Sequence, residues 1–126
     1  MKLKNIFIYS ILLLIFSFAF IYPAYANKAS AKIVSPDVAK KGEIITIEIN
    51  VFHKGNSYFH HVDWVYVKVN NKEIARWDFT ANDRPKTENF TREITIKVEK
   101  PVTVVAEAHC NLHGSAGAVE KNIDVK

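Results

Sequence analysis

The chain has 126 residues, of which 17 are basic and 13 acidic, and its formal net charge is +4. The charged residues are interspersed, with no basic block that could follow a phosphate backbone, so nucleic-acid binding has no support. The sequence contains no GxSxG elbow, Walker loop, HExxH helix or dinucleotide fingerprint. The usual hydrolase and nucleotide-binding mechanisms are therefore excluded.

The first 26 residues have the features of a secretory signal. Lys2 and Lys4 precede an apolar stretch from Ile6 to Tyr22, and Ala24-Tyr25-Ala26 is a small-x-small site for signal peptidase. We therefore expect residues 1–26 to be a cleaved signal peptide, and the protein to be periplasmic or secreted. The apolar stretch also just reaches the length that spans a bilayer, so an uncleaved membrane anchor is the alternative.

Residues 27–126 are predicted to form one domain, because a chain of this length builds one core but not two. Without Lys2 and Lys4, 15 basic residues face 13 acidic ones, so the net charge of +2 says little about partners. Cys110 is the only cysteine, which excludes an internal disulfide. A lone thiol in an oxidising compartment has to be buried or bonded to another group.

Successive segments of this domain are rich in β-branched and aromatic residues and alternate with period two, as half-buried strands do. Asn70-Asn71 separates two of them and suits a tight hairpin turn, since asparagine tolerates positive φ. About seven strands at this spacing predict an all-β fold, a two-sheet antiparallel sandwich. The predicted strands are Ala31–Val34, Glu43–Phe52, His61–Val69, Lys72–Thr80, Phe90–Val98, Pro101–His109 and Ala118–Val125.

All five histidines fall into two clusters at the ends of predicted strands, where loops can converge on one rim of a sandwich. Cys110 and His113 are three residues apart in a turn, a spacing that lets both bind one ion. Imidazole suits iron, copper and zinc, and thiolate adds a soft donor. The alternative is a buried structural cysteine with surface histidines, but five histidines around one cysteine favour a metal site. The clusters are His53, His60 and His61, then His109 and His113 on either side of Cys110.

The motif CNLHG at Cys110–Gly114, preceded by a strand and by HHVDW at His60–Trp64, carries a resemblance. It resembles the iron-binding domain of superoxide reductases, the desulfoferrodoxin and neelaredoxin family, over about residues 53–125. The resemblance implies an immunoglobulin-like sandwich with four histidines around a mononuclear, non-haem ferrous ion and an axial cysteine thiolate. It also implies one-electron reduction of superoxide to hydrogen peroxide, with electrons from an external donor protein.

Residue by residue, the resemblance implies four metal ligands: His53, His60, Cys110 and His113, with Cys110 as the catalytic residue. His60 matches the first histidine of the family's paired motif, while Cys110 and His113 match the axial thiolate and its neighbouring imidazole. His53 matches the loop histidine, although six residues separate it from His60 where the family usually has five, and Lys54 replaces the usual proline. Period two turns His61 away from His60, so we expect it behind the ligands or at the surface.

The family's fourth histidine has no counterpart, because no histidine occurs between Asn27 and Phe52. The lysine that accompanies it in the family is missing with it. His109 or water could fill the fourth position, although a residue next to Cys110 on a strand normally points to the other face. A site of three histidines and one cysteine is the simpler expectation.

Two other functions stay open at this point. A cupredoxin-like copper protein for electron transfer also uses two histidines and a cysteine, but usually with a methionine after the second histidine; here the only methionine is Met1. A non-enzymatic interaction subunit is the other alternative. The segment Ser35–Ile49 is similar to the opening of the small sandwich subunit of the sulfur-carrier complex in thiosulfate oxidation, which supports the fold more than the function.

Overall fold

The structure is a computed structural model that describes residues 3–18 and 27–126. Helix α1 (Leu3–Phe18) lies in the predicted signal segment. Within the described residues, no helix has both the length and the apolar character that a membrane crossing requires. The predicted cleavage site at Ala24–Ala26 falls outside the described residues, so the signal peptide stays a prediction.

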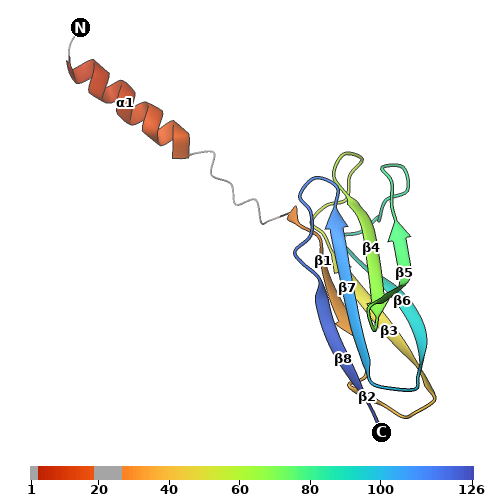
Figure 1. The fold of residues 1–126 in the computed structure, drawn as a ribbon. Helices are drawn as coiled ribbons and strands as arrows, with labels where there is room; N and C mark the ends of the chain where they lie inside the picture. The colour runs from red at the N-terminus through yellow and green to blue at the C-terminus, as the bar shows by residue number, and fades with distance from the viewer. Residues whose placement is uncertain (1–2, 19–26) are drawn as a thin grey trace.

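Within residues 27–126, eight strands form two facing sheets, which confirms the predicted all-β sandwich (Figure 1). One sheet has the order β1-β3-β6 and the other β2-β8-β7-β4-β5, and all neighbours are antiparallel except β2 and β8. Seven strands match the predicted ones within two residues at each end, and the two-residue strand β2 is additional. The strands are β1 (Ser30–Val34), β2 (Val38–Ala39), β3 (Glu43–Phe52), β4 (Val62–Val69), β5 (Lys72–Asp78), β6 (Asn89–Val98), β7 (Val102–Cys110) and β8 (Val119–Val125).

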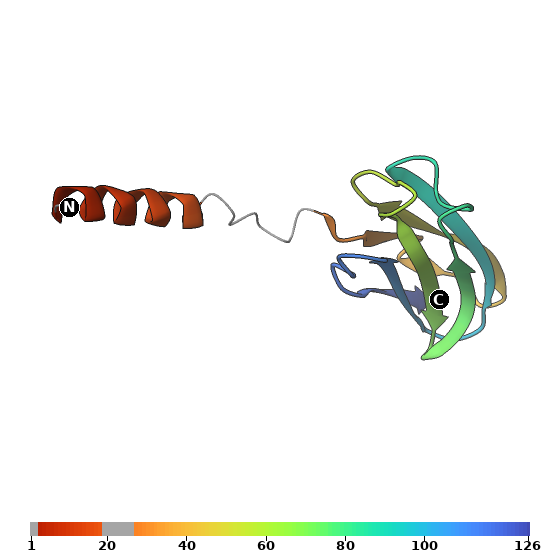
Figure 2. The ribbon, with the colours of Figure 1, turned by 90° about the horizontal axis from the view of Figure 1, so that it is seen from above.

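Seen from above, the two sheets lie as two layers that face each other (Figure 2). The core between them follows from the period-two pattern of the central strands. In β3, Ile45, Ile47 and Ile49 are buried, and each fully buried side chain of this size contributes about 1.5–3 kcal/mol of hydrophobic free energy. In β7 every second residue is buried, and Cys110 occupies the last of these inward positions. The thiol therefore sits where the core meets the rim of the sandwich.

Two connections illustrate how local sequence sets the path of the chain. Asn70 and Asn71 both have positive φ, 49° and 67°, and close the hairpin between β4 and β5 as predicted. Between β6 and β7 the chain passes Glu99 and Lys100 and changes from the three-stranded to the five-stranded sheet. Because β7 then runs antiparallel to β4, its end at Cys110 lies beside the start of β4 at Val62.

Candidate metal centre

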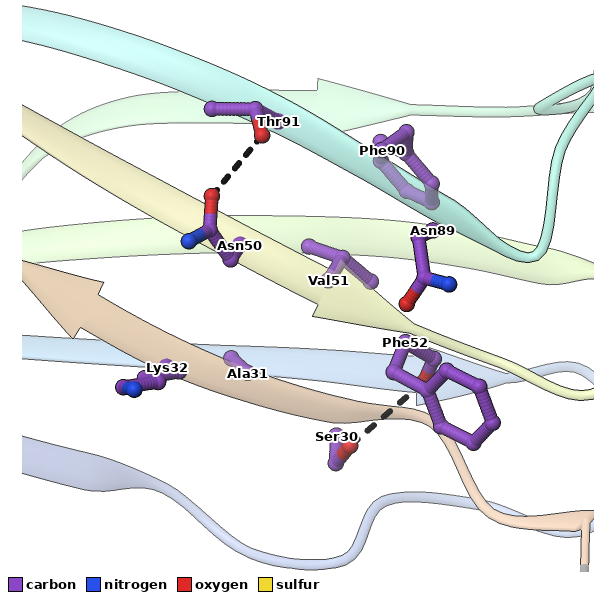
Figure 3. Close-up of a pocket in the computed structure, with 9 residues that line it drawn as sticks. All are labelled: Ser30, Ala31, Lys32, Asn50, Val51, Phe52, Asn89, Phe90 and Thr91. Carbon is purple, nitrogen blue, oxygen red and sulfur yellow. Dashed lines mark hydrogen bonds between the residues drawn. The ribbon is translucent and has the colours of Figure 1, made fainter.

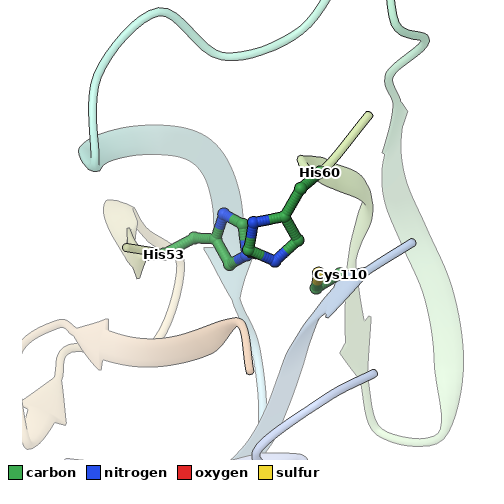
Figure 4. Close-up of side chains that lie close together, drawn as sticks. All are labelled: His53, His60 and Cys110. Atoms are coloured by element: carbon green, nitrogen blue, oxygen red, sulfur yellow. Dashed lines mark hydrogen bonds between the residues drawn. The ribbon is translucent and has the colours of Figure 1, made fainter. Parts of the chain in front are cut away.

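Three separate segments bring a thiol and three imidazoles to one rim of the sandwich. His53 follows β3, His60 precedes β4, and Cys110 ends β7, with His113 in the turn after it. Figure 4 shows the rings of His53 and His60 beside Cys110. One possible ligand atom from each of these three side chains lies within 4.8 Å of the other two.

The distances between the ring nitrogens suit ligands of a single ion. His60 Nε2 lies 3.2 Å from His53 Nε2 and 2.9 Å from His113 Nδ1. Two nitrogens that each lie about 2.1 Å from one ion, at a right angle, are about 3.0 Å apart. Cys110 Sγ lies 3.9 Å from His113 Nδ1, so the sulfur is part of the same cluster. His53, His60 and Cys110 therefore lie close enough together to bind one transition metal that accepts both imidazole and thiolate, and His113 Nδ1 lies beside two of them.

The environment favours the neutral form of the His60 ring. His53 and Cys110 have no solvent-exposed surface, His60 is half-buried and His113 is exposed. Burial, and then the neighbouring His53 and His113 rings, lowers the pKa of His60 below its usual range, while a hydrogen bond with the backbone of Asn27 acts in the opposite direction. A neutral ring retains the lone pair that a metal requires.

The turn after β7 holds Cys110 and His113 together through its backbone. Cys110 and Gly114 exchange two backbone hydrogen bonds of 3.0 and 2.9 Å, and the N–H of His113 donates to Cys110 Sγ at 3.5 Å. Gly114 has a φ of 79°, a conformation that residues with a side chain rarely adopt. The glycine of the motif thus closes the turn that points both ligand atoms to one side.

Asn111 fixes the backbone on both sides of His60. Its amide oxygen accepts the backbone N–H of His61 at 2.9 Å, and its amide nitrogen donates to the carbonyl of Phe59 at 3.1 Å. The backbone N–H of Asn111 also donates to the His61 carbonyl at 3.0 Å. The residue after the thiol therefore places the peptide that carries the His60 ring. Sequence reasoning did not single out Asn111, although its position between two candidate ligands could have drawn attention to it.

The structure places His61 and His109 outside the cluster. His61 is buried, with 6% of its surface exposed, and its Nδ1 lies 3.2 Å from the carbonyl oxygen of Ser57. His61 is therefore a buried residue next to the candidate ligand His60, and it is not a surface residue. His109 Nδ1 lies 2.6 Å from Asp63 Oδ1, and its ring stacks on Trp64 with centroids 4.7 Å apart. His109 therefore lies on the outer face of the sheet, where Asp63 and Trp64 are its partners.

A β-bulge explains this arrangement of the outer face. The register between β4 and β7 shifts between Val62 and Trp64, so that Asp63 is an extra residue in β4. Val62 and Val65 are both fully buried, while Asp63 and Trp64 between them are partly exposed. Simple alternation fails over this segment because two successive side chains face outward.

A hollow of about 440 Å³ lies elsewhere, where β1, β3 and β6 run side by side (Figure 3). The hydroxyl of Thr91 on β6 donates to Asn50 Oδ1 on the neighbouring strand β3 at 2.8 Å. The hollow contains neither histidine nor cysteine and belongs to a different part of the sandwich from the histidine cluster. Its lining residues are Ser30, Ala31, Lys32, Asn50, Val51, Phe52, Asn89, Phe90 and Thr91.

The comparisons with solved structures agree with the fold. Superoxide reductase (neelaredoxin) from Ignicoccus hospitalis has a similar structure, with a TM-score of 0.68 and 22% identity over 86% of this chain and 89% of that one. A variant of the same protein gives a TM-score of 0.67 and 24% identity over 80% and 83%. The sulfur carrier protein SoxY from Chlorobium limicola gives 0.53 and 11% identity over 76% and 78%.

No curated protein sequence is significantly similar to this chain. The family model described as desulfoferrodoxin, in contrast, matches residues 23–116. This segment includes His53, His60, Cys110 and His113, and it covers most of the chain. The chain therefore belongs to the desulfoferrodoxin family.

Proposed function

We propose that this protein is an exported iron enzyme that reduces superoxide by one electron to hydrogen peroxide. The proposal rests on one observation, the convergence of three imidazole nitrogens and the Cys110 sulfur at the rim. Family membership supports iron as the metal, and the resemblance of the CNLHG motif to superoxide reductases supports the reaction. The cleaved signal predicted at residues 1–26 supports a periplasmic or secreted location.

In this proposal, His53 and His60 would hold the iron through Nε2, His113 through Nδ1 and Cys110 through its sulfur. Ferrous iron, when bound, supplies the electron, so that superoxide gains one electron and two protons to become hydrogen peroxide. The thiolate of Cys110 would donate electron density to the bound ion, as soft sulfur ligands do in other iron sites. Neutral imidazoles and one thiolate leave a divalent ion with a net positive charge, which attracts an anionic substrate.

Access to the site follows from the exposure of its members. His113 is exposed, whereas His53 and Cys110 are buried, so substrate approaches from the side of His113. The only thiol of the chain is Cys110, and it is already part of the site. We expect an external donor protein to supply the electron that restores the ferrous state.

Metal analysis with an absorption spectrum tests the proposed site. We expect one iron per chain and, in the oxidised protein, a visible band from sulfur-to-iron charge transfer. Cys110→Ser is expected to abolish the band, because oxygen replaces the sulfur donor. The matched control is His109→Ala, which removes an imidazole one residue away on the outer face and should retain the band. Copper or zinc in place of iron, or a band that survives in Cys110→Ser, would contradict the proposed centre.

The reaction itself is tested by the stoichiometry of superoxide consumption. The reduced protein is expected to consume one superoxide per iron and to form hydrogen peroxide without releasing oxygen. A dismutase would release oxygen and would turn over without a reductant. Oxygen release under these conditions would therefore exclude reduction as the activity.

A further inference from the structure

The side chain of Asn56 connects one candidate ligand to two other segments of the rim. Its Oδ1 lies 3.0 Å from His53 Nδ1 and also accepts the backbone N–H of Val62 at 3.0 Å. Its Nδ2 donates to the carbonyl of Thr87 at 3.0 Å. Asn56 is half-buried in the loop between β3 and β4, three residues after His53.

These contacts determine which nitrogen of His53 carries a proton. The N–H of Val62 can only donate and the carbonyl of Thr87 can only accept, so the orientation of the Asn56 amide is fixed. The atom that faces His53 Nδ1 is therefore the amide oxygen, an acceptor. Because an acceptor requires a donor opposite it, Nδ1 carries the proton and the lone pair of the neutral ring is at Nε2. Nε2 is the atom that lies 3.2 Å from His60 Nε2.

We propose that Asn56 is a positioning residue of the metal centre, which acts by holding His53 in the Nδ1–H tautomer with Nε2 directed at the ion. The inference rests on the proposed iron site and adds to it a residue outside the predicted ligand set. In metal sites generally, an oxygen that accepts the second N–H of a ligating histidine fixes the ring and raises its basicity. Loss of such a partner typically costs about 10- to 100-fold in metal affinity.

Asn56 also has an ordinary structural role, since it joins the β3–β4 loop to Val62 and to Thr87. Two variants separate the two roles. Asn56→Asp keeps an oxygen acceptor for His53 and Val62 but loses the donor to Thr87. Asn56→Leu has a similar size and loses all three hydrogen bonds. A positioning role predicts that Asp preserves the behaviour of His53, whereas a purely structural role through Thr87 predicts that both variants fail alike.

The first measurement is the tautomer of His53 in the metal-free protein, read from the ¹⁵N chemical shifts of its ring. We expect the Nδ1–H form in the wild-type chain and in Asn56→Asp. In Asn56→Leu, the ring is expected to populate both tautomers. An unchanged Nδ1–H form in Asn56→Leu would overturn the inference. Since no metal is present, this result does not depend on the proposed reaction.

The second measurement is metal affinity, by competition of the folded protein with a chelator for ferrous iron. We expect Asn56→Leu to lose about 10- to 100-fold and Asn56→Asp to stay close to the wild type. Asn82→Leu, at an exposed loop amide, is the control for a general effect of the substitution. An equal loss in Asp and Leu would reject the positioning role while leaving the iron site in place. A wild-type chain that binds no iron would instead reject the proposed function.

Discussion

Two groups of side chains at the end of β7 contain histidines: the outer-face cluster of His109, Asp63 and Trp64, and the rim cluster of His53, His60, Cys110 and His113. The two clusters differ in what the ring nitrogens meet. On the outer face, His109 meets the carboxylate of Asp63 and the flat surface of Trp64. At the rim, the nitrogens of His53, His60 and His113 meet one another.

The polar and aromatic side chains around His109 on the outer face contact one another. Trp64 also stacks on Tyr66, the guanidinium of Arg76 lies 5.2 Å from the Trp64 ring, and the Tyr66 hydroxyl donates to Glu107 at 2.7 Å. That hydrogen bond, followed by burial, raises the pKa of Tyr66 to about 12. Each polar group here has an oppositely charged, hydrogen-bonding or aromatic partner within the protein.

The rim cluster lacks oppositely charged partners among the described residues. Within the part of the chain that the structure describes, no carboxylate contacts the three converging ring nitrogens. Each ring nitrogen offers either one proton or one lone pair, so three facing nitrogens cannot all be satisfied by hydrogen bonds among themselves. A cation at their centre would satisfy all of them. The partners of a histidine, more than its position next to a cysteine, therefore distinguish a structural ring from a candidate ligand.

The largest expected contrast is in metal affinity. His60→Ala removes the nitrogen that contacts both other rings and should weaken iron binding by at least about 100-fold, more than the loss of a residue behind a ligand. His109→Ala, in the other cluster, should leave the affinity unchanged. Chelator competition measures both. Similar losses in the two variants would mean that the clusters are not separate.

A second effect concerns His60 in the rim cluster, which makes the free energy of unfolding depend on pH. The pKa of folded His60 is lowered from an unfolded value of about 6.5, so the unfolded state binds more protons in this range. The contribution of His60 to stability is therefore fully present above pH 6.5 and is lost as the pH falls through the lowered folded value. Urea unfolding of the metal-free protein should show a lower midpoint at pH 5.5 than at pH 7.5. His60→Gln should reduce this difference, and a midpoint that rises on acidification would contradict the assignment.

A smaller effect is expected on the outer face. Asp63→Asn removes the charge from the contact with His109, where both side chains are about one-third exposed. We expect a loss of about 1 kcal/mol in the free energy of unfolding, between the values of an exposed ion pair and a buried charged hydrogen bond. Urea unfolding measures it. The visible band of the iron protein should be unchanged, and its disappearance would connect the two clusters.

The smallest effect is expected at Leu112, which lies between Asn111 and His113 but has 62% of its surface exposed. Leu112→Ser should change the free energy of unfolding by less than about 0.5 kcal/mol and leave the band intact. The reason is that backbone hydrogen bonds of Cys110 and Gly114 hold the turn. A loss of iron in this variant would show that packing of the leucine also positions the turn.

The sandwich and the members of the rim cluster could be predicted because their signals lie in residues that are close together in the sequence. Period-two alternation identifies strands because one face of each is buried, and Asn70-Asn71 marks a hairpin because both residues tolerate positive φ. The CNLHG motif identifies its own turn because Cys110, His113 and Gly114 interact within five residues. The assignment of His53, His60, Cys110 and His113 as ligands stays a prediction, although their side chains lie together.

Other features depend on contacts between distant segments and could not be read from local patterns. The extra residue Asp63 in β4 changes which side chains face outward, and it becomes visible only when β4 pairs with β7. His61 is buried because Asn111, fifty residues later, fixes its backbone. The tautomer of His53 depends on the amide of Asn56, whose orientation is set by Val62 and Thr87. Sequence determines which groups are available, but only tertiary packing decides which of their atoms meet, because hydrogen-bond partners far apart in the chain are chosen by the folded backbone.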